Sequence, residues 1–82
     1  MSKIIWQEYI YSDPEILLGK PAIKGTRISV ELILSLYEKG WKEEQILQSY
    51  PTLKIEHLRA VFNYVGECIK QELFFPSTRK VA

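Results

Sequence analysis

The sequence contains very little cysteine or histidine, and this scarcity excludes several kinds of site. Among its 82 residues there is one cysteine, Cys68, and one histidine, His57. A single cysteine allows no internal disulfide. The two residues lie on a segment that we expect to be one helix, where their sequence separation corresponds to about 16 Å. They therefore cannot share a metal ion or form a Cys–His nucleophile pair. We expect no metal, no cofactor and no enzymatic activity.

Long apolar runs are also absent. No stretch approaches the ~20 apolar residues of a membrane-spanning helix, and the chain does not open with a charged segment followed by an apolar one. The share of hydrophobic residues is 46% and that of charged residues is 26%, as in ordinary cytosolic proteins. We therefore expect a cytoplasmic protein without membrane contact, folded as a single domain over residues 1–82. Domains of this size frequently depend on a partner, so we also expect a homodimer.

An excess of positive charge is lacking as well. The chain has 11 lysines and arginines against 10 acidic residues, which gives a net charge of +1. Nucleic-acid-binding proteins usually carry a basic excess, because most of their non-specific affinity comes from neutralising phosphates. A nucleic-acid site in this protein must therefore come from local clustering of cations or from a symmetric dimer.

The N-terminal third of the chain shows the patterns of short extended segments. Residues 4–11, IIWQEYIY, are rich in β-branched and aromatic side chains, which favour a strand. Neither face of this strand is cleanly polar, so we expect Trp6 and Tyr9 to contact their own domain or a second copy. The stretch SDPEILLG suits a short helical turn that ends at Gly19. PAIKG and TRIS then form a β-ribbon that turns at Gly25, where a positive φ is needed.

Three cations, Lys20, Lys24 and Arg27, follow one another in this ribbon with no acidic residue between them. A phosphate-binding loop of the Walker type is excluded, because Gly19-Lys20 is followed by Pro21, which has no N–H to donate. The cluster is either a solvated edge or a contact for a phosphate backbone or an acidic partner. Arg27 either binds an acidic partner residue or braces the ribbon by bonding carbonyls at a helix C-terminus, and we favour bracing.

Helical spacing of apolar residues begins at Ser29 and predicts three helices. Ser29 is a suitable N-cap for the first helix, and Gly40 ends it. The second helix covers about residues 42–49 and ends before a proline, and the third covers about residues 55–73. The apolar stripe of the third helix is expected to consist of Leu58, Val61, Phe62, Val65, Ile69 and Leu73.

The predicted fold is mainly α: a β-ribbon over residues 1–28, a three-helix bundle over residues 29–73 and a tail over residues 74–82. The last two helices are joined by a short link, SYPTLK, and resemble a helix-turn-helix unit whose final helix reads DNA. In the tail, Phe74 and Phe75 either anchor in a partner groove or fold back over the protein's own helices.

The candidate DNA contacts are cations that reach phosphates and an amide that addresses base edges. Glu56 and Glu67 share the outward face of the third helix with Ala60 and would repel DNA, so an ordinary solvated face is an equal alternative. The candidates for DNA binding are Lys42, Lys54, His57, Arg59, Asn63 and Lys70, and those for a partner or a second copy are Trp6, Tyr9, Lys20, Lys24, Arg27, Phe74 and Phe75.

Three stretches, DPEILLGKPAIKGTRISVELIL, EKGWKEEQILQSYPTL and HLRAVFNYV, resemble the small bacterial domain-of-unknown-function family 433. The resemblance covers about residues 9–66. It implies a homeodomain-like three-helix fold and a role as the antitoxin of a toxin–antitoxin pair. Such a protein would neutralise a PIN-like ribonuclease toxin and regulate its own operon. The alternative is a protein-interaction adaptor with the same fold and no DNA binding, which the near-zero net charge favours.

Two positions depart from the family pattern. Lys42 and Lys54 stand where the family usually places a capping Ser, Thr or Asp. Each missing cap costs about 1 kcal/mol, and a lysine at a helix N-terminus also opposes the helix dipole. A nearby anion such as a DNA phosphate would make these cations favourable, which gives a second reason to consider DNA as a partner.

Overall fold

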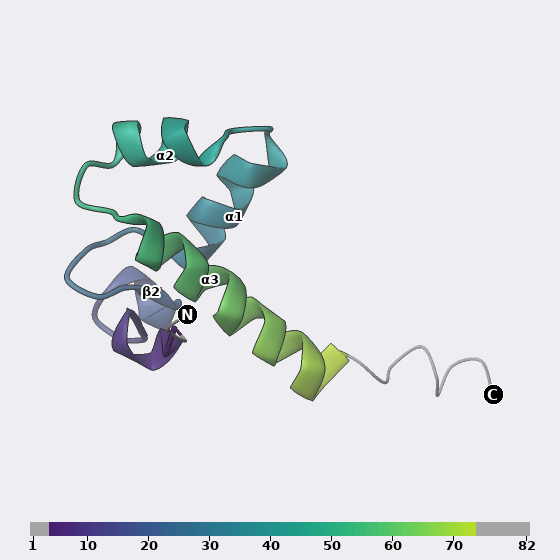
Figure 1. Cartoon of the computed structure of the whole chain (residues 1–82). Helices are drawn as coiled ribbons and strands as arrows, with labels where there is room; N and C mark the ends of the chain where they lie inside the picture. The colour runs from purple at the N-terminus through teal and green to yellow at the C-terminus, as the bar shows by residue number, and fades with distance from the viewer. Residues whose placement is uncertain (1–3, 74–82) are drawn as a thin grey trace.

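A computed structural model describes residues 4–73 and shows a small two-stranded ribbon followed by three helices (Figure 1). The mainly helical architecture with an N-terminal antiparallel ribbon is as predicted. No helix formed by the described part of the chain is long and apolar enough to cross a membrane. In chain order the elements are the 3-10 turn η1 (Trp6–Glu8), β1 (Ile10–Tyr11), the 3-10 turn η2 (Leu17–Gly19), β2 (Ala22–Ile23), α1 (Val30–Glu38), α2 (Glu43–Ser49), α3 (Ile55–Cys68) and the π-helical turn η3 (Ile69–Leu73).

The ribbon is a short antiparallel pair extended by a hairpin. β1 pairs with β2 so that Ile10 lies opposite Ile23. After β2 the chain turns at Gly25, whose φ of +77° confirms the predicted positive value. A further bridge joins Ala22 to Ser29, so that PAIKG and TRIS are paired as expected. The hairpin thus delivers the chain to the first residue of α1.

The strand predicted over residues 4–11 is wrong for most of its length. Only its last two residues are paired in a strand, and Trp6–Glu8 form a 3-10 turn in which the Tyr9 N–H donates to the Trp6 carbonyl at 2.8 Å. The reason is a contact with α3. Trp6 and Tyr9 are three positions apart, so a strand would direct them to opposite faces, whereas a 3-10 turn places both on one side. Both rings pack on α3, Trp6 against Tyr64 and Tyr9 against His57.

The segment before β2 is also more irregular than the helical turn expected there. The Asp13 carboxylate accepts a hydrogen bond from the Glu15 N–H at 2.9 Å, which is the local capping expected of this residue. The turn itself comes later and is left-handed. Leu17, Leu18 and Gly19 have φ values of 53°, 58° and 82°. Two consecutive leucines in this region are unusual, because the side chain of an L-residue is crowded there.

The ends of α1 follow the local signals in the sequence. The Ser29 hydroxyl oxygen accepts a hydrogen bond from the Leu32 N–H at 2.9 Å, which confirms the predicted N-cap. At the other end Gly40 has a φ of +92°. The Trp41 N–H reaches back to the Leu36 carbonyl at 3.0 Å, which completes a Schellman motif. The helix is therefore fixed at both ends by its own sequence.

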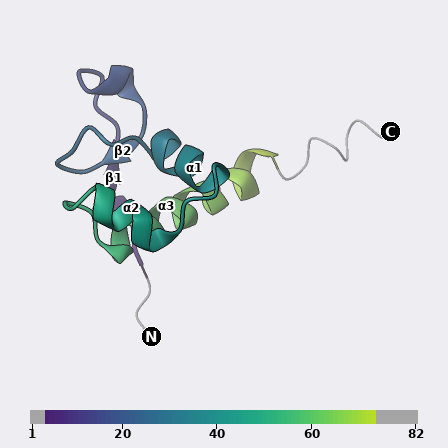
Figure 2. The same cartoon turned by 90° about the horizontal axis from the view of Figure 1, so that it is seen from above.

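The core lies where the ribbon meets the three helices. α3 supplies three of its members, and η1 packs along the same helix. The C-terminal part of α3 extends beyond α1 and α2, as Figures 1 and 2 show. The buried apolar residues are Ile10, Ala22, Ile23, Val30, Ile33, Leu36, Ile46, Leu53, Leu58, Ala60 and Val61.

The predicted apolar stripe of α3 is correct at its start and wrong further along. Leu58 and Val61 are fully buried, whereas Phe62 and Ile69 are 46% and 45% exposed. Ala60, expected on the outward face, is fully buried instead. The N-terminal segment packs on the side of α3 opposite to α1 and α2, so that the buried surface is wider than the stripe at the start of the helix. Beyond Tyr64, Ile69 is left exposed.

One polar group is buried among the helices. The hydroxyl group of Tyr37 lies near the Glu43 carboxylate but makes no hydrogen bond of ordinary length and angle among residues 4–73. The Tyr37 ring packs against Phe62 with the two centroids 4.9 Å apart. Burial raises the pKa of Tyr37 above its ordinary value, and the negative charge of Glu43 raises this pKa further. Arg59 opposes the shift by a smaller amount.

We expect Tyr37→Phe to raise the free energy of unfolding at neutral pH by about 1 kcal/mol, because it removes a buried hydroxyl that lacks a partner and keeps the ring. The raised folded-state pKa means that the stability contributed by the protonated tyrosine is present below the ordinary value of 10.0 and is lost as the pH rises through the folded-state value. Urea unfolding measured from about pH 8 to pH 11 should therefore show a smaller alkaline loss in the variant. Equal losses in both proteins would contradict this assignment.

Candidate functional site

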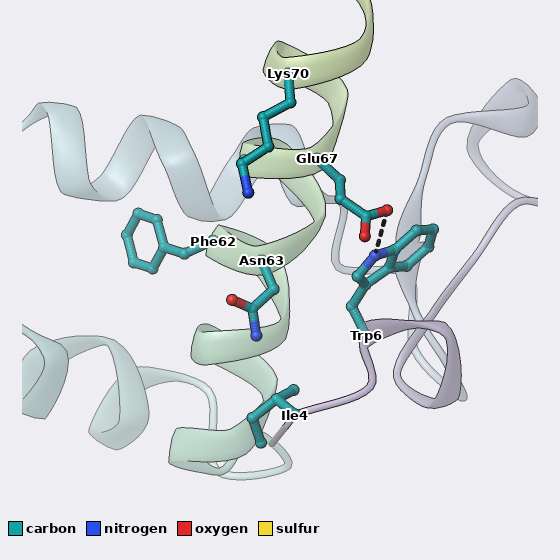
Figure 3. A pocket seen from close by; sticks show the side chains of 7 residues that line it. Ile4, Trp6, Phe62, Asn63, Glu67 and Lys70 are labelled. Carbon is teal, nitrogen blue, oxygen red and sulfur yellow. Dashed lines mark hydrogen bonds between the residues drawn. The ribbon is translucent and has the colours of Figure 1, made fainter.

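A recess lies between the N-terminal segment and the outward face of α3. Its volume is about 320 Å³. Figure 3 shows that Asn63 and Lys70 project from α3 into the space between Phe62 on one side and Trp6 on the other. Gly66 adds no side chain to the recess. A Cβ placed there would meet nothing within 4 Å, so the recess is open at this position. The residues around the recess are Ile4, Trp6, Phe62, Asn63, Gly66, Glu67 and Lys70.

The polar groups of the recess are arranged in two sets. On the N-terminal side the Trp6 indole N–H donates to the Glu67 carboxylate at 3.3 Å, and this bond ties η1 to α3 (Figure 3). On the helix face Asn63 and Lys70 are exposed and offer an amide and an ammonium group. Donors beside aromatic surfaces can bind a planar polar group or an anion. The recess therefore offers donors and aromatic surface to a planar polar group or an anion.

The N-terminus of α3 is capped by the side chain of its third residue, His57. Lys54, the N-cap, makes no capping bond with its side chain, as predicted from the departure at this position. Its backbone N–H instead donates to Nδ1 of His57 at 2.9 Å, which is half of a capping box. The His57 ring also makes an edge-to-face contact with Tyr9, with centroids 5.4 Å apart. His57, a candidate DNA contact, therefore keeps only Nε2 for any further bond.

The start of α2 repeats this arrangement. Lys42 is an exposed N-cap without a side-chain bond, and its N–H donates to the Gln45 amide oxygen at 2.8 Å. The two lysines that depart from the family pattern thus lie at the N-termini of α2 and α3, with α2 between them (Figure 1). Both ammonium groups remain available to a ligand.

The remaining DNA candidates lie on the open face of α3. Arg59, Asn63 and Lys70 are all exposed and follow one another along the helix at intervals of about two turns or less. Glu56 is exposed on the same face, as the sequence indicated. The negative charge of Glu67 is at the margin of this face, where it accepts the bond from Trp6. The open face therefore has mixed charge.

The three cations of the ribbon do not act as one cluster. Lys20 forms an ion pair with Glu31 of α1 at 3.0 Å, so its charge is locally balanced. Lys24 and Arg27 are exposed on the hairpin. Among the described residues Arg27 is exposed, and no bracing bond to a helix C-terminus is seen. Its guanidinium group faces solvent and is available to an acidic partner.

The residues predicted to contact a partner or a second copy divide into two groups. Trp6 and Tyr9 are half-buried against the chain's own α3, which is one of the two alternatives considered for them. Phe74 and Phe75 lie outside the described residues. No three His, Cys, Asp or Glu side chains between residues 4 and 73 come together as a metal site would require.

Besides Ile4, which was assigned to the predicted strand, three members of the recess were not expected from the sequence. Phe62 was predicted in the core, Glu67 was considered only as a charge that repels DNA, and Gly66 was not considered. A signal for them exists in the spacing. Residues 59, 62, 63, 66, 67 and 70 recur at intervals of three and four, which places them on one side of a helix. The part played by Trp6 could not be found in this way, because it depends on the fold of the N-terminal segment.

Comparison with known proteins identifies relatives of this domain. The family DUF433, described as "Protein of unknown function (DUF433)", matches residues 10–65. An uncharacterized protein of Sinorhizobium fredii (strain NBRC 101917 / NGR234), y4eO, is 33% identical over 58 residues, which are 71% of this chain and 26% of that protein. The present chain thus corresponds to about a quarter of that relative.

A solved structure has the same arrangement of elements. The crystal structure of a DUF433 member protein from Anabaena variabilis ATCC 29413 superimposes with a TM-score of 0.73 at 29% sequence identity. The match covers 79% of this chain and 64% of the other. The ribbon and three helices described above therefore form an architecture that this chain shares with a protein of the same family.

Proposed function

This chain belongs to the DUF433 family of proteins of unknown function. We propose that it is an antitoxin-like DNA-binding protein that represses its own operon and neutralises a PIN-like ribonuclease toxin, the role that the family resemblance implies. The observation that carries the DNA-binding part is the link between α2 and α3. Leu53 anchors this short link in the core, and α3 follows with an open face that bears Arg59 and Asn63. A homeodomain-like helix-turn-helix presents its last helix to the major groove in this way.

Each side chain has a separate part in this proposal. Lys54, Arg59 and Lys70 neutralise phosphates, and Asn63 pairs with a base edge through its amide. Lys42 at the start of α2 holds a phosphate of the opposite strand or an adjacent turn through its ammonium group. A dimer would double this modest number of cations, which offsets the near-zero net charge of one chain. Such a protein acts in the cytoplasm.

The toxin-binding part of the proposal uses surfaces away from α3. The hairpin exposes Lys24 and Arg27, which suit an acidic patch on a partner. Phe74 and Phe75, in the segment that follows the described residues, are apolar anchors for a partner groove. Co-purification of the tagged protein with the product of the adjacent gene tests this part. Loss of that complex on charge reversal of Lys24 and Arg27 is the expected result, and a complex unaffected by it would exclude the hairpin.

DNA binding is tested by replacing the two lysine caps. We expect Lys42→Ser/Lys54→Ser to stabilise the free protein by about 1 kcal/mol per site, because serine caps the helix and removes a charge that opposes the dipole. The same variant should bind the DNA upstream of its own gene more weakly. The slope of log K against log salt should become shallower by about 0.9 for each phosphate that the variant no longer neutralises.

The matched control is Lys24→Ser, which removes one charge from the hairpin and should leave the salt slope unchanged. Fluorescence anisotropy with labelled duplex at several salt concentrations gives both quantities, and urea unfolding gives the stability. If the lysine variant gains stability while DNA affinity and slope stay as in the wild type, the lysines make no phosphate contact. If the wild-type protein shows no salt-dependent binding, the DNA-binding proposal is withdrawn.

A second function, a protein-interaction adaptor without DNA binding, is favoured by a specific observation. The N-terminal segment occupies one flank of α3, where Tyr9 packs on His57 and Trp6 holds Glu67. The face that remains open carries Glu56 beside its cations. An adaptor would use the recess for a polar side chain of a protein partner. Binding of the adjacent gene product together with absence of a DNA shift would support this function over the first.

A further inference from the structure

A second cavity lies on the other side of α3 from the recess. It is a groove of about 480 Å³ between α1 and α3, and the ribbon closes one end of it. Its walls are almost entirely apolar and include Pro21, Val30 and Leu34 on one side and Val65 and Ile69 on the other. Ile69 is 45% exposed there, in the part of α3 that extends beyond the other helices. An apolar groove of this kind normally marks a contact surface.

A protruding apolar side chain lies close in sequence to the residues at one end of this groove. Leu18 is 92% exposed, only two residues before Lys20, which lines the groove together with Pro21. Its loop is held by backbone bonds, with the Gly19 N–H donating to the Ile16 carbonyl at 3.0 Å. The left-handed φ of 58° at Leu18 fixes the side chain in this outward position. Figure 2 shows the blue-purple loop of η2 standing clear of the three helices.

A leucine that has a left-handed backbone conformation and a side chain exposed to water is unfavourable in two respects. The backbone conformation is crowded for a residue with a branched side chain, and the apolar side chain gains nothing from burial. Backbone strain of this kind persists where the surrounding structure holds it, and it is concentrated at positions that contact other molecules. Leu18 is therefore better explained as a contact residue than as part of the free surface.

We propose that two copies of this chain associate about a twofold axis, with Leu18 of each copy inserted into the groove between α1 and α3 of the other. A twofold interface requires one surface that carries both complementary features side by side. The protruding Leu18 and the groove beginning near Pro21 meet that requirement within a few residues. The association does not depend on DNA binding and uses a surface different from the N-terminal segment.

The charges at the edge of the groove are also self-complementary under a twofold rotation. Lys20 and Glu31 lie 3.0 Å apart, with 57% and 71% of their side chains exposed. A twofold rotation that places Leu18 over the other groove brings the cation of one copy near the anion of the other. Both ion pairs can then be exchanged between copies, so the rim is complementary in charge to a second copy and does not repel it.

Sedimentation velocity of the full chain across about a hundredfold range of concentration tests the proposal. The wild type should show a reversible monomer–dimer equilibrium. Leu18→Asn should weaken it by more than about a hundredfold, because two leucines per dimer lose their burial. Asparagine adopts the left-handed conformation readily, so this variant should be folded and at least as stable as the wild-type monomer. Leu18→Met keeps an apolar side chain and should retain the dimer, and Ile69→Lys should disrupt it from the side of the groove.

A mixing experiment tests reciprocity. Lys20→Glu makes the rim wholly acidic and Glu31→Lys makes it wholly basic, so each variant alone should dimerise several-fold more weakly than the wild type. An equimolar mixture should form heterodimers in preference to either homodimer. A wild-type protein that stays monomeric throughout, as expected if the groove takes the chain's own tail or another protein, overturns the proposal. So does a dimer that Leu18→Asn leaves intact, or a mixture without preference for heterodimers.

Discussion

Replacing Ile33 by alanine is expected to lower the free energy of unfolding by about 3 kcal/mol. Ile33 is at the centre of α1, is fully buried and belongs to the cluster that joins the ribbon to all three helices. The loss combines the transfer free energy of the missing carbons with the cavity that they leave, and neighbouring residues fixed by the ribbon cannot fill that cavity. Because a domain of this size has a total stability of only several kcal/mol, the variant should unfold at a much lower urea concentration.

The control removes the same atoms at an exposed position. Ile5 is 52% exposed, so Ile5→Ala should cost less than about 1 kcal/mol. Urea unfolding followed by far-ultraviolet circular dichroism gives both values, with equal m-values expected because neither variant changes the surface exposed on unfolding by much. Similar losses for the two variants would mean that the core is not centred where the ribbon meets the helices.

The second large effect is expected at Trp6. Trp6→Ala should lower the free energy of unfolding by about 2 kcal/mol, because the half-buried ring packs on Tyr64 with centroids 4.7 Å apart and contributes apolar burial. The N-terminal segment should then separate from α3. Amide hydrogen exchange of α3 around the buried Ala60 should accelerate, whereas exchange in α1 should change little.

Trp6→Phe distinguishes the contribution of ring packing from that of the indole N–H. It keeps an aromatic ring against α3 and removes the exposed bond to Glu67, so we expect a loss of less than about 1 kcal/mol. If Trp6→Phe costs as much as Trp6→Ala, the hydrogen bond rather than the ring packing attaches the N-terminal segment. An exchange rate around Ala60 that is the same in all three proteins would show that the segment does not protect α3.

The helices could be predicted from the sequence because their ends are encoded by single residues. Ser29 caps α1 through its own hydroxyl, and Gly40 supplies the positive φ that ends it. Such signals act over three or four residues and do not depend on the rest of the chain. The turn of the ribbon at Gly25 was predictable for the same reason.

The N-terminal segment could not be predicted because its structure follows from contacts far along the chain. IIWQEYIY has the composition of a strand, but the Trp6–Glu67 bond joins residues separated by 61 positions. The packing of Trp6 on Tyr64 and of Tyr9 on His57 favours a 3-10 turn over the extended conformation. Ala60, which local spacing assigned to the solvent face, is buried. The left-handed conformation of Leu17 and Leu18 has no sequence signal, since the residue types that favour it are Gly, Asn and Asp.

The candidate site was predictable by residue type and less so by arrangement. The cations and the amide expected at the surface of α3 are exposed there, and the lysine caps lack side-chain bonds as their chemistry requires. The pairing of Lys20 with Glu31 was not predictable, because it depends on how the ribbon meets α1. Composition thus identifies which groups are available, and only the fold determines which of them are already occupied.

Because α3 extends beyond α1 and α2, the number of its C-terminal turns that are helical can change. Within residues 4–73 its last turns extend beyond α1 and α2, and they are followed by the π-helical turn Ile69–Leu73. The free energy that keeps these turns wound is therefore smaller than that of the helix start and comes mostly from local bonds. Any molecule that covers Ile69 adds to this free energy, so that binding at the groove and winding of the C-terminal turns are thermodynamically linked.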